Sequence, residues 1–165
     1  MLIFVTGLPG TGKTTFARAL ARSLKAVHLN TDIIRDLLNM RGMYDDASKM
    51  KVYEELLKKT DETLQYGHSV IVDGTFYKME VRQPFIDVGV KYNKRIEWIE
   101  IKANEQIIAE RVSQKRTYSE ADYEVYLYIK SIYEPLQKAH LTLWSDQHDI
   151  EQMIHLTIKH YDFTI

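Results

Sequence analysis

The first residues of the chain combine glycines, a lysine and hydroxyl side chains at a spacing that suits a bound polyphosphate. The segment reads GLPGTGKTT, with Gly7 and Gly12 five positions apart and Lys13 and Thr14 directly after them. Glycines let a loop wrap closely around an anion, so that backbone N–H groups point at its oxygens. A helix that begins near Lys13 adds the positive end of its dipole, and the Thr14 hydroxyl is suited to ligate Mg²⁺.

This pattern predicts a phosphate-binding loop for a nucleoside triphosphate, with ATP and Mg²⁺ as the expected cofactors. Lys13 is expected to reach the β- and γ-phosphates and to act in catalysis. The predicted cofactor-binding residues of this segment are Gly7, Leu8, Pro9, Gly10, Thr11, Gly12, Lys13, Thr14 and Thr15.

A carboxylate and an arginine follow the second predicted strand, in the segment LNTDIIR. Asp32 and Arg35 are three positions apart and would lie on neighbouring faces of a helical turn. An acceptor hydroxyl gains from a carboxylate that orients it and takes its proton, whereas an acceptor phosphate needs only arginines. We therefore expect Asp32 to be a catalytic base and Arg35 to lie beside the acceptor. A helix N-cap is the alternative role of Asp32, and the two roles can coexist.

A second carboxylate ends the apolar segment SVIVD. This pattern is typical of a Walker B strand, and Asp73 would hold Mg²⁺ opposite Thr14, through a water molecule. Thr75 and Phe76 come next and are expected to form part of the wall of the acceptor pocket. Arg82 is about two helical turns further on, and either reaches an acceptor phosphate or is solvated.

Basic residues gather in the segment RVSQKR, where one predicted helix ends and another begins. Such a hinge fits a lid, at about residues 111–122, that closes over the triphosphate and excludes water. Arg116 would then contact the phosphate in transfer, and Arg111 would lie on the nucleotide side. Cations at a helix C-terminus are also favoured by the helix dipole without any function.

These residues are spaced along a chain in which short apolar runs alternate with amphipathic ones. Such alternation predicts an α/β fold with a parallel sheet that is covered on both faces, and ligands bind at the carboxyl ends of such strands. The helix at 79–92 is expected to be interrupted or to end near Gly89, and Trp98 and Trp144 are expected in the core. Predicted strands cover 2–6, 27–29, 69–73, 95–101 and 141–144, and predicted helices cover 14–25, 33–40, 47–66, 79–92, 105–115, 120–133 and 150–160.

Composition limits the classes of protein that remain. The 165 residues suit one domain, and with no cysteine the chain has neither disulfides nor thiolate metal sites. The absence of cysteine fits a reducing cytoplasm, where we expect the protein. No apolar run approaches the ~18 residues that span a membrane. A net charge of −1 does not favour a nucleic-acid partner, although a local basic groove is still allowed.

Two other classes of P-loop protein fit the sequence less well. Guanine recognition usually uses Asn-Lys-x-Asp after a strand, but Asn93-Lys94 is followed by Arg95 and Ile96 and precedes a predicted strand. Motor and remodelling ATPases usually need more mass than 165 residues supply.

Taken together, the segments GLPGTGKTT, TDIIRDLL, VIVDGTF and ERVSQKRTYSEADYEVYLYIKSIYEP resemble a P-loop kinase family. This family includes phage-type polynucleotide 5′-hydroxyl kinases, zeta-toxin-like kinases and many small bacterial kinases. The resemblance implies a three-layer P-loop NTPase fold with a five-stranded parallel sheet in the order 2-3-1-4-5 and a helical lid. It also implies Mg²⁺-ATP-dependent transfer to a hydroxyl, with Asp32 as base, Arg35 near the acceptor, and Arg111 and Arg116 in the lid.

The sequence thus predicts a single kinase domain over residues 1–165. This domain would transfer the γ-phosphoryl group of ATP to a hydroxyl of a small molecule or nucleotide. A polynucleotide 5′-hydroxyl kinase is one alternative, less favoured by the net charge. An ATP-binding sensor or toxin-type module with little turnover is another.

Overall fold

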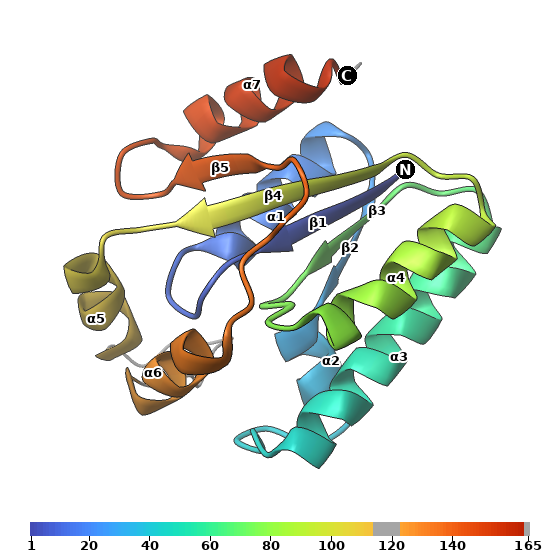
Figure 1. Cartoon of the computed structure of the whole chain (residues 1–165). Helices are drawn as coiled ribbons and strands as arrows, with labels where there is room; N and C mark the ends of the chain where they lie inside the picture. The colour runs from blue at the N-terminus through green and yellow to red at the C-terminus, as the bar shows by residue number, and fades with distance from the viewer. Residues whose placement is uncertain (114–122, 164–165) are drawn as a thin grey trace.

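The computed structural model describes residues 1–113 and 123–163. Strands and helices alternate along this part of the chain (Figure 1). The strands are β1 (Leu2–Thr6), β2 (Val27–Asn30), β3 (Val70–Asp73), β4 (Ile96–Lys102) and β5 (Leu141–Trp144). The helices are α1 (Lys13–Ser23), α2 (Thr31–Leu37), α3 (Asp46–Gln65), α4 (Met79–Lys91), α5 (Glu105–Ser113), α6 (Tyr123–Ile132) and α7 (Ile150–Tyr161).

The five strands form one parallel sheet in the order β2-β3-β1-β4-β5, which confirms the predicted fold class and strand order. In this order β1 is central and β3 separates it from β2. The register pairs Asp73 of β3 with Val5 on one side and Asn30 on the other. The carboxyl ends of β1, β2 and β3 therefore meet at one edge, where the phosphate-binding loop and α2 begin.

Helices cover both faces of the sheet (Figure 1). Leu2 and Phe4 of β1 belong to an apolar core with residues of α3 and α4, whereas Ile3 and Val5 belong to a second core with residues of α1 and α7. Alternate residues of one strand thus face two cores. A central strand that is buried on both faces needs apolar residues at successive positions, which explains the sequence LIFV of β1.

The helix at 79–92 was expected to be interrupted or to end near Gly89; α4 runs through Gly89 without a break and ends two residues later, at Lys91. A Cβ atom at Gly89 would lie 2.7 Å from Ile96 Cδ1 and 3.1 Å from Leu2 Cδ2. The glycine therefore lets α4 pack closely on the sheet and does not end the helix.

The two tryptophans differ. Trp98 is buried and stacks on Phe4 with ring centroids 3.7 Å apart, as expected for a core residue. Trp144 is 37% exposed, so its predicted place in the core was wrong. It is the last residue of the edge strand β5. Among the described residues, no helix has the length and apolar character required to cross a membrane.

Candidate active site

A cavity of about 650 Å³ opens at the carboxyl ends of β1, β2 and β3, within the range of small-molecule sites. The phosphate-binding loop and α1 line one end of it, and residues of α2, α3 and α6 line the other. The predicted residues that line it are Pro9, Gly10, Gly12, Lys13, Thr14, Thr15, Asp32, Arg35, Asp73 and Thr75.

The phosphate-binding loop, residues 7–14, has a backbone that only glycine allows at its first position. Gly7 has φ +140°, and a Cβ atom there would lie 2.2 Å from the carbonyl oxygen of Ile101 in β4. The loop therefore lies directly against the neighbouring strand. Gly7, Leu8 and Thr11 do not line the cavity; Leu8 packs against the apolar core and Thr11 is buried.

The N-terminus of α1 faces the cavity without a side-chain cap. Its N-cap is Gly12, which has no side chain to accept hydrogen bonds from the first turn. Lys13 Nζ donates to the Leu8 carbonyl over 2.9 Å, and Thr11 Oγ1 donates to the same oxygen over 2.9 Å. These bonds close the loop, and the uncapped helix end is suited to an anion.

Asn30 connects the elements that meet in the cavity. Its Nδ2 donates to Asp73 Oδ2 over 2.6 Å and to Thr14 Oγ1 over 3.1 Å, while its Oδ1 accepts from the backbone N–H groups of Asp32 and Ile33. It is thus the N-cap of α2, and the alternative role of Asp32 as that cap was wrong. Sequence reasoning missed Asn30, although its place at the end of a strand before Asp32 was visible.

Asp73 is fully buried, and only one of its carboxylate oxygens is satisfied. Oδ2 accepts from Asn30 and lies 3.2 Å from His28 Nε2, a residue that sequence reasoning also missed. Oδ1 is buried with no hydrogen-bond partner among the described residues. An unpartnered buried carboxylate oxygen is costly unless a ligand satisfies it.

These residues fit a magnesium ion that takes most of its ligands from phosphate and water. Asp73 Oδ1 and the Thr14 hydroxyl are hard oxygen donors in one cavity, linked through Asn30. Among residues 1–113 and 123–163, no group of three or more His, Cys, Asp or Glu side chains forms a metal cage. Mg²⁺ usually has few protein ligands, and the site matches that preference.

Asp32 lies in the first turn of α2 and lines the cavity. Burial raises the pKa of its carboxyl group to about 6, and the positive charge of Lys13 opposes this rise. The pKa is thus close to neutrality, where a carboxylate can accept a proton and release it again.

Arg35 is buried and held at the same end of the cavity. Its Nη1 donates to the Met43 carbonyl over 2.6 Å, and its guanidinium carbon lies 4.5 Å from the centre of the Tyr44 ring. Its Nε is buried and has no hydrogen-bond partner within the described residues.

Phe76 and Arg82 do not line the cavity, so the structure differs from the expected acceptor wall at these two positions. Phe76 is fully buried in the aromatic core behind it, 5.2 Å from Phe4 and from Phe85 between ring centres. Arg82 Nε donates to the Phe76 carbonyl over 2.6 Å, and its Nη2 donates to the Glu134 carbonyl. Arg82 thus joins α4 to the segment after α6 and is not solvated.

Arg111 contacts the outer side of the phosphate-binding loop. Its Nη1 donates to Ser145 Oγ over 2.8 Å and to the Gly10 carbonyl over 3.4 Å, and Ser145 Oγ donates to the Thr11 carbonyl over 2.7 Å. Arg111 therefore fastens the loop to the end of β5. Arg116 and most of the predicted lid at 111–122 lie outside the described residues.

Further cations and tyrosines that sequence reasoning did not single out also line the cavity. Most come from helices in which they looked like solvated or packing residues. They are Arg18 and Arg22 of α1, Lys49 and Tyr53 of α3, Tyr44 before α3, and Tyr77 after β3.

Known proteins are similar to this chain in sequence and in fold. Residues 2–136 match a protein family described as AAA domain. An uncharacterized protein of Mycobacterium tuberculosis is 32% identical over 123 residues, which are 67% of this chain and 25% of that protein. The L-seryl-tRNA(Sec) kinase of Methanococcus maripaludis is 28% identical over 121 residues, 67% of this chain and 44% of that protein. The chain thus spans about a quarter to under half of the length of these relatives.

Among solved structures, the APS kinase of Mycobacterium tuberculosis in complex with AMPPNP and APS has a TM-score of 0.77 at 22% identity. The alignment covers 98% of this chain and 97% of that one. The fold is therefore that of P-loop kinases, and with most of its length matched, this chain belongs to the AAA domain family.

Proposed function

We propose that this chain is an ATP-dependent kinase that transfers the γ-phosphoryl group to a hydroxyl of a small molecule or nucleotide. The observation that carries the proposal is that Asp32, with a pKa of about 6, shares one cavity with the phosphate-binding loop and Asp73. A carboxylate beside the triphosphate suits a hydroxyl acceptor, which must lose a proton.

The phosphate-binding loop would hold the triphosphate. The uncapped N-terminus of α1 and the Lys13 ammonium would contact the β- and γ-phosphates, once Lys13 exchanges the Leu8 carbonyl for phosphate oxygens. Thr14 and Asp73 would hold Mg²⁺, which supplies charge stabilisation to the transferring group when bound.

Asp32 would position the acceptor hydroxyl and receive its proton. The hydroxyl oxygen forms a bond to the γ-phosphorus while the bond from that phosphorus to the β–γ bridging oxygen breaks, and ADP leaves. Arg35, held next to Tyr44, would lie beside the acceptor. We also propose that residues 1–165 form one domain, with a lid at about 111–122 in which Arg111 lies at the base and Arg116 reaches the transferring group.

The relatives differ in what their names say they phosphorylate. One is an L-seryl-tRNA(Sec) kinase and another has the acceptor APS bound. This variety supports phosphoryl transfer to a hydroxyl as the shared chemistry and leaves the acceptor to this chain's own pocket.

Radiolabelled ATP with Mg²⁺ and a panel of acceptors tests the proposal. The panel holds small alcohols, nucleosides, nucleotides and an oligonucleotide with a 5′-hydroxyl, and Lys13→Ala serves as the inactive control. Label in a small molecule or nucleotide supports the proposal. Label in the oligonucleotide alone would indicate a polynucleotide kinase, and ATP binding with no label anywhere would indicate a sensor or toxin-type module.

A further inference from the structure

The turn between β3 and α4, residues 74–78, brings side chains alternately to the cavity and to the core. Thr75 and Tyr77 line the cavity, whereas Phe76 between them is fully buried among the aromatic rings behind it. Phe76 has a φ of +46°, in the left-handed region that a residue with a Cβ atom seldom adopts. Such a conformation persists only where the surroundings hold it, and it is frequent beside functional sites.

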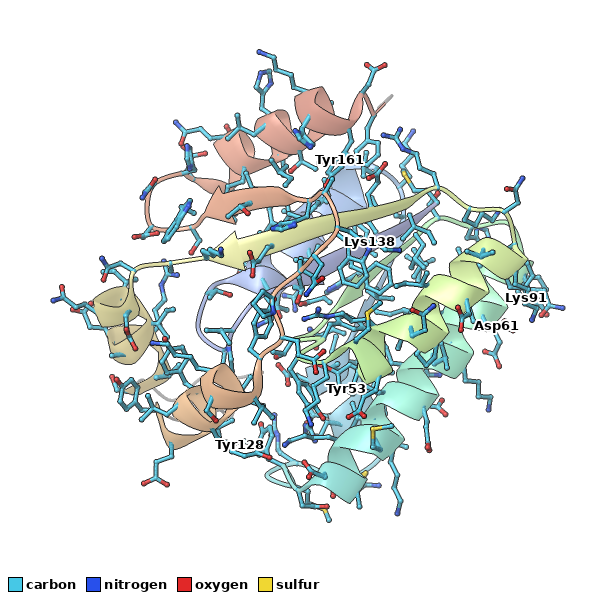
Figure 2. All side chains as sticks on the ribbon, in the orientation of Figure 1. Tyr53, Asp61, Lys91, Tyr128, Lys138 and Tyr161 are labelled. Carbon is cyan, nitrogen blue, oxygen red and sulfur yellow. The ribbon has the colours of Figure 1, made fainter. Side chains whose placement is uncertain are left out.

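Side chains from three elements hold the main chain of this turn. Tyr53 Oη of α3 accepts from the Phe76 N–H group over 3.0 Å (Figure 2), and Arg82 Nε of α4 donates to the Phe76 carbonyl over 2.6 Å. Thr6 Oγ1 of β1 donates to the Thr75 carbonyl over 2.6 Å. Both polar main-chain groups of Phe76 are thus bonded by side chains, so tertiary contacts fix its conformation.

Arg82 also holds a second segment, the one that follows α6. Its Nη2 donates to the Glu134 carbonyl and its Nη1 to the Pro135 carbonyl, the latter over 3.4 Å. In return, the Glu134 N–H group donates to the Tyr77 carbonyl over 2.7 Å, and Glu134 Oε2 accepts from the Met79 N–H group over 2.7 Å. The last bond caps α4, whose own N-cap residue supplies no side-chain bond. The turn and the segment after α6 are therefore bonded in both directions.

The helix α6, from which this segment leads, forms another wall of the cavity. Val125 and Ile129 of α6 line the cavity, and the chain from α6 passes the start of α4 on its way to β5 (Figure 1). Arg82 itself does not line the cavity. It therefore joins the turn to the segment after α6 from outside the cavity.

The chemistry of Arg82 suits such a joint. The side chain is 4% exposed, and its hydrogen-bond partners in the described part of the chain are all main-chain carbonyl groups. Because no carboxylate there neutralises the buried charge, the burial is costly, and its benefit is a rigid fork whose N–H groups reach the carbonyls of two segments at once. A lysine ammonium is a single point charge on a flexible stem and cannot replace that fork.

We propose that Arg82 is a positioning residue for the acceptor. It fixes the turn that carries Thr75 and Tyr77 relative to α6, so that the acceptor hydroxyl is held against Asp32. The proposal rests on the proposed function, and Arg82 acts only through the residues that it bonds. Loosening the joint leaves the phosphate-binding loop unchanged, since no hydrogen bond of Arg82 goes to residues 7–14, but it orients the acceptor less well and lowers turnover.

The first experiment tests the joint without phosphoryl transfer. Hydrogen exchange of single main-chain amides is followed by NMR in the wild-type protein and in Arg82→Lys. The Phe76 and Glu134 N–H groups lie on the two joined segments, and both should exchange roughly tenfold faster or more in the variant. Arg95→Lys is the control, because Arg95 also donates to a distant carbonyl, that of Tyr161, and does not line the cavity. It should leave both amides unchanged.

The second experiment measures whether the joint affects the reaction. Radiolabelled ATP is used with the acceptor that the wild-type protein labels best. Arg82→Lys should lower kcat/KM for that acceptor roughly tenfold, mostly through kcat, and keep the Kd of Mg²⁺-AMPPNP within about twofold. Glu134→Ala removes the cap of α4 at an exposed side chain and should have a smaller effect of the same kind. Arg95→Lys should change neither value. Thermal unfolding shows how far each variant is destabilised, and a merely structural role of Arg82 would lower stability alone.

Three results would overturn the positioning role. These are unchanged exchange at both amides in Arg82→Lys, a folded Arg82→Lys with the kcat/KM of the wild-type protein, and an equal loss of kcat/KM in Arg95→Lys. If Arg82→Lys does not fold, Glu134→Ala replaces it, and wild-type turnover in that variant would overturn the role. If the wild-type protein labels no acceptor, the proposed kinase activity is contradicted, and faster exchange at both amides still supports the joint.

Discussion

The phosphate-binding loop and the α2–α3 end of the cavity are built from different groups: the loop from the main chain, and the α2–α3 end from side chains. At the loop, the main chain makes the site: Gly7 lies directly against the Ile101 carbonyl, and Gly12 leaves the N-terminus of α1 uncapped. At the other end, side chains from two helices make the site, with Arg35 and Lys49 buried beside tyrosines.

This difference separates what each end can recognise. Backbone N–H groups and a helix dipole bind any polyphosphate of suitable size, because the main chain is the same in every residue. Side chains differ in shape and charge, so under the proposed function we expect the α2–α3 end to distinguish one acceptor from another. Changes at the loop should therefore affect folding and nucleotide binding, and changes at the other end should affect turnover and acceptor choice.

Gly7→Ala is expected to have the largest effect, because it disrupts the end of the cavity that the main chain forms. The new Cβ atom would lie 2.2 Å from a strand carbonyl at a positive φ, so the loop and β4 must separate. We expect the free energy of unfolding to fall by about 4 kcal/mol and ATP binding to be lost. Urea unfolding and calorimetric titration with Mg²⁺-ATP measure the two effects.

Gly67→Ala is the matched control for this change. Gly67 also has a positive φ, of +83°, but a Cβ atom there meets nothing within 4 Å. Backbone strain alone should then cost about 1 kcal/mol and leave ATP binding intact. Equal losses in the two variants would contradict the close packing of the loop on β4.

Asp32→Asn should affect the side-chain end and leave the loop intact. Without a proton acceptor, kcat should fall by ~10²-fold or more while the affinity for ATP stays nearly unchanged. In the wild-type protein, kcat/KM should rise with pH through about 6, as the Asp32 carboxyl group loses its proton. Steady-state kinetics between pH 5 and 8 measure this, and unchanged turnover in the variant would show that Asp32 is not the base.

Asn30→Ala should affect both ends of the cavity, since Asn30 contacts Thr14 next to the loop and the first turn of α2. The variant loses the hydrogen bonds to Asp73 and Thr14 and the cap of α2. Because Asp73 would keep a buried carboxylate with fewer partners, we expect a loss of about 2 kcal/mol in unfolding free energy and a weaker dependence of activity on Mg²⁺.

Asn104→Ala supplies the comparison for that loss. Asn104 Oδ1 accepts from the Gln106 backbone N–H at the start of α5, and the residue is exposed. Removing this surface cap should cost about 1 kcal/mol or less in urea unfolding. If the two asparagine variants are equally stable, the buried network around Asn30 contributes little.

The same contrast explains how far the sequence predicts this molecule. The phosphate-binding loop is local: its glycines, Lys13 and Thr14 occupy adjacent positions, so a short pattern identifies it. Alternating strands and helices likewise predicted the parallel sheet, and the family resemblance predicted its strand order, which the structure confirms. Asp32 and Asp73 stood out in the sequence because Asp32 lies just after one predicted strand and Asp73 ends another, at the same edge of the sheet.

The α2–α3 end of the cavity could not be predicted in this way. Lys49 lies in the amphipathic helix α3, where a lysine is usually solvated, and only the packing of α3 against α2 brings it to the cavity that Arg35 also lines. The position of Arg82 in the sequence suggested that it could reach the pocket, but its guanidinium group donates to the Phe76 and Glu134 carbonyls. Glu134 is 52 residues away in the sequence, so no local pattern contains this pairing. Long-range contacts of this kind depend on tertiary packing, which spacing alone does not encode.

Asp32 should also limit stability, by a small amount that depends on pH. Burial raises the pKa of its carboxyl group from 3.8 to about 6, so folding favours the protonated form. The stabilisation that the protonated carboxyl contributes is complete below pH 3.8 and is lost as the pH rises through about 6.

Asparagine has no such titration. The advantage of Asp32→Asn over the wild-type protein in unfolding free energy should thus grow by about 1 kcal/mol between pH 5 and pH 8, with allowance for partial solvent exposure. Urea unfolding of both proteins at each pH measures this difference. A gain in stability together with a loss of turnover would show that the acceptor end holds its carboxylate for chemistry at the expense of the fold, whereas a difference that stays constant with pH would mean that Asp32 is solvated like a surface residue.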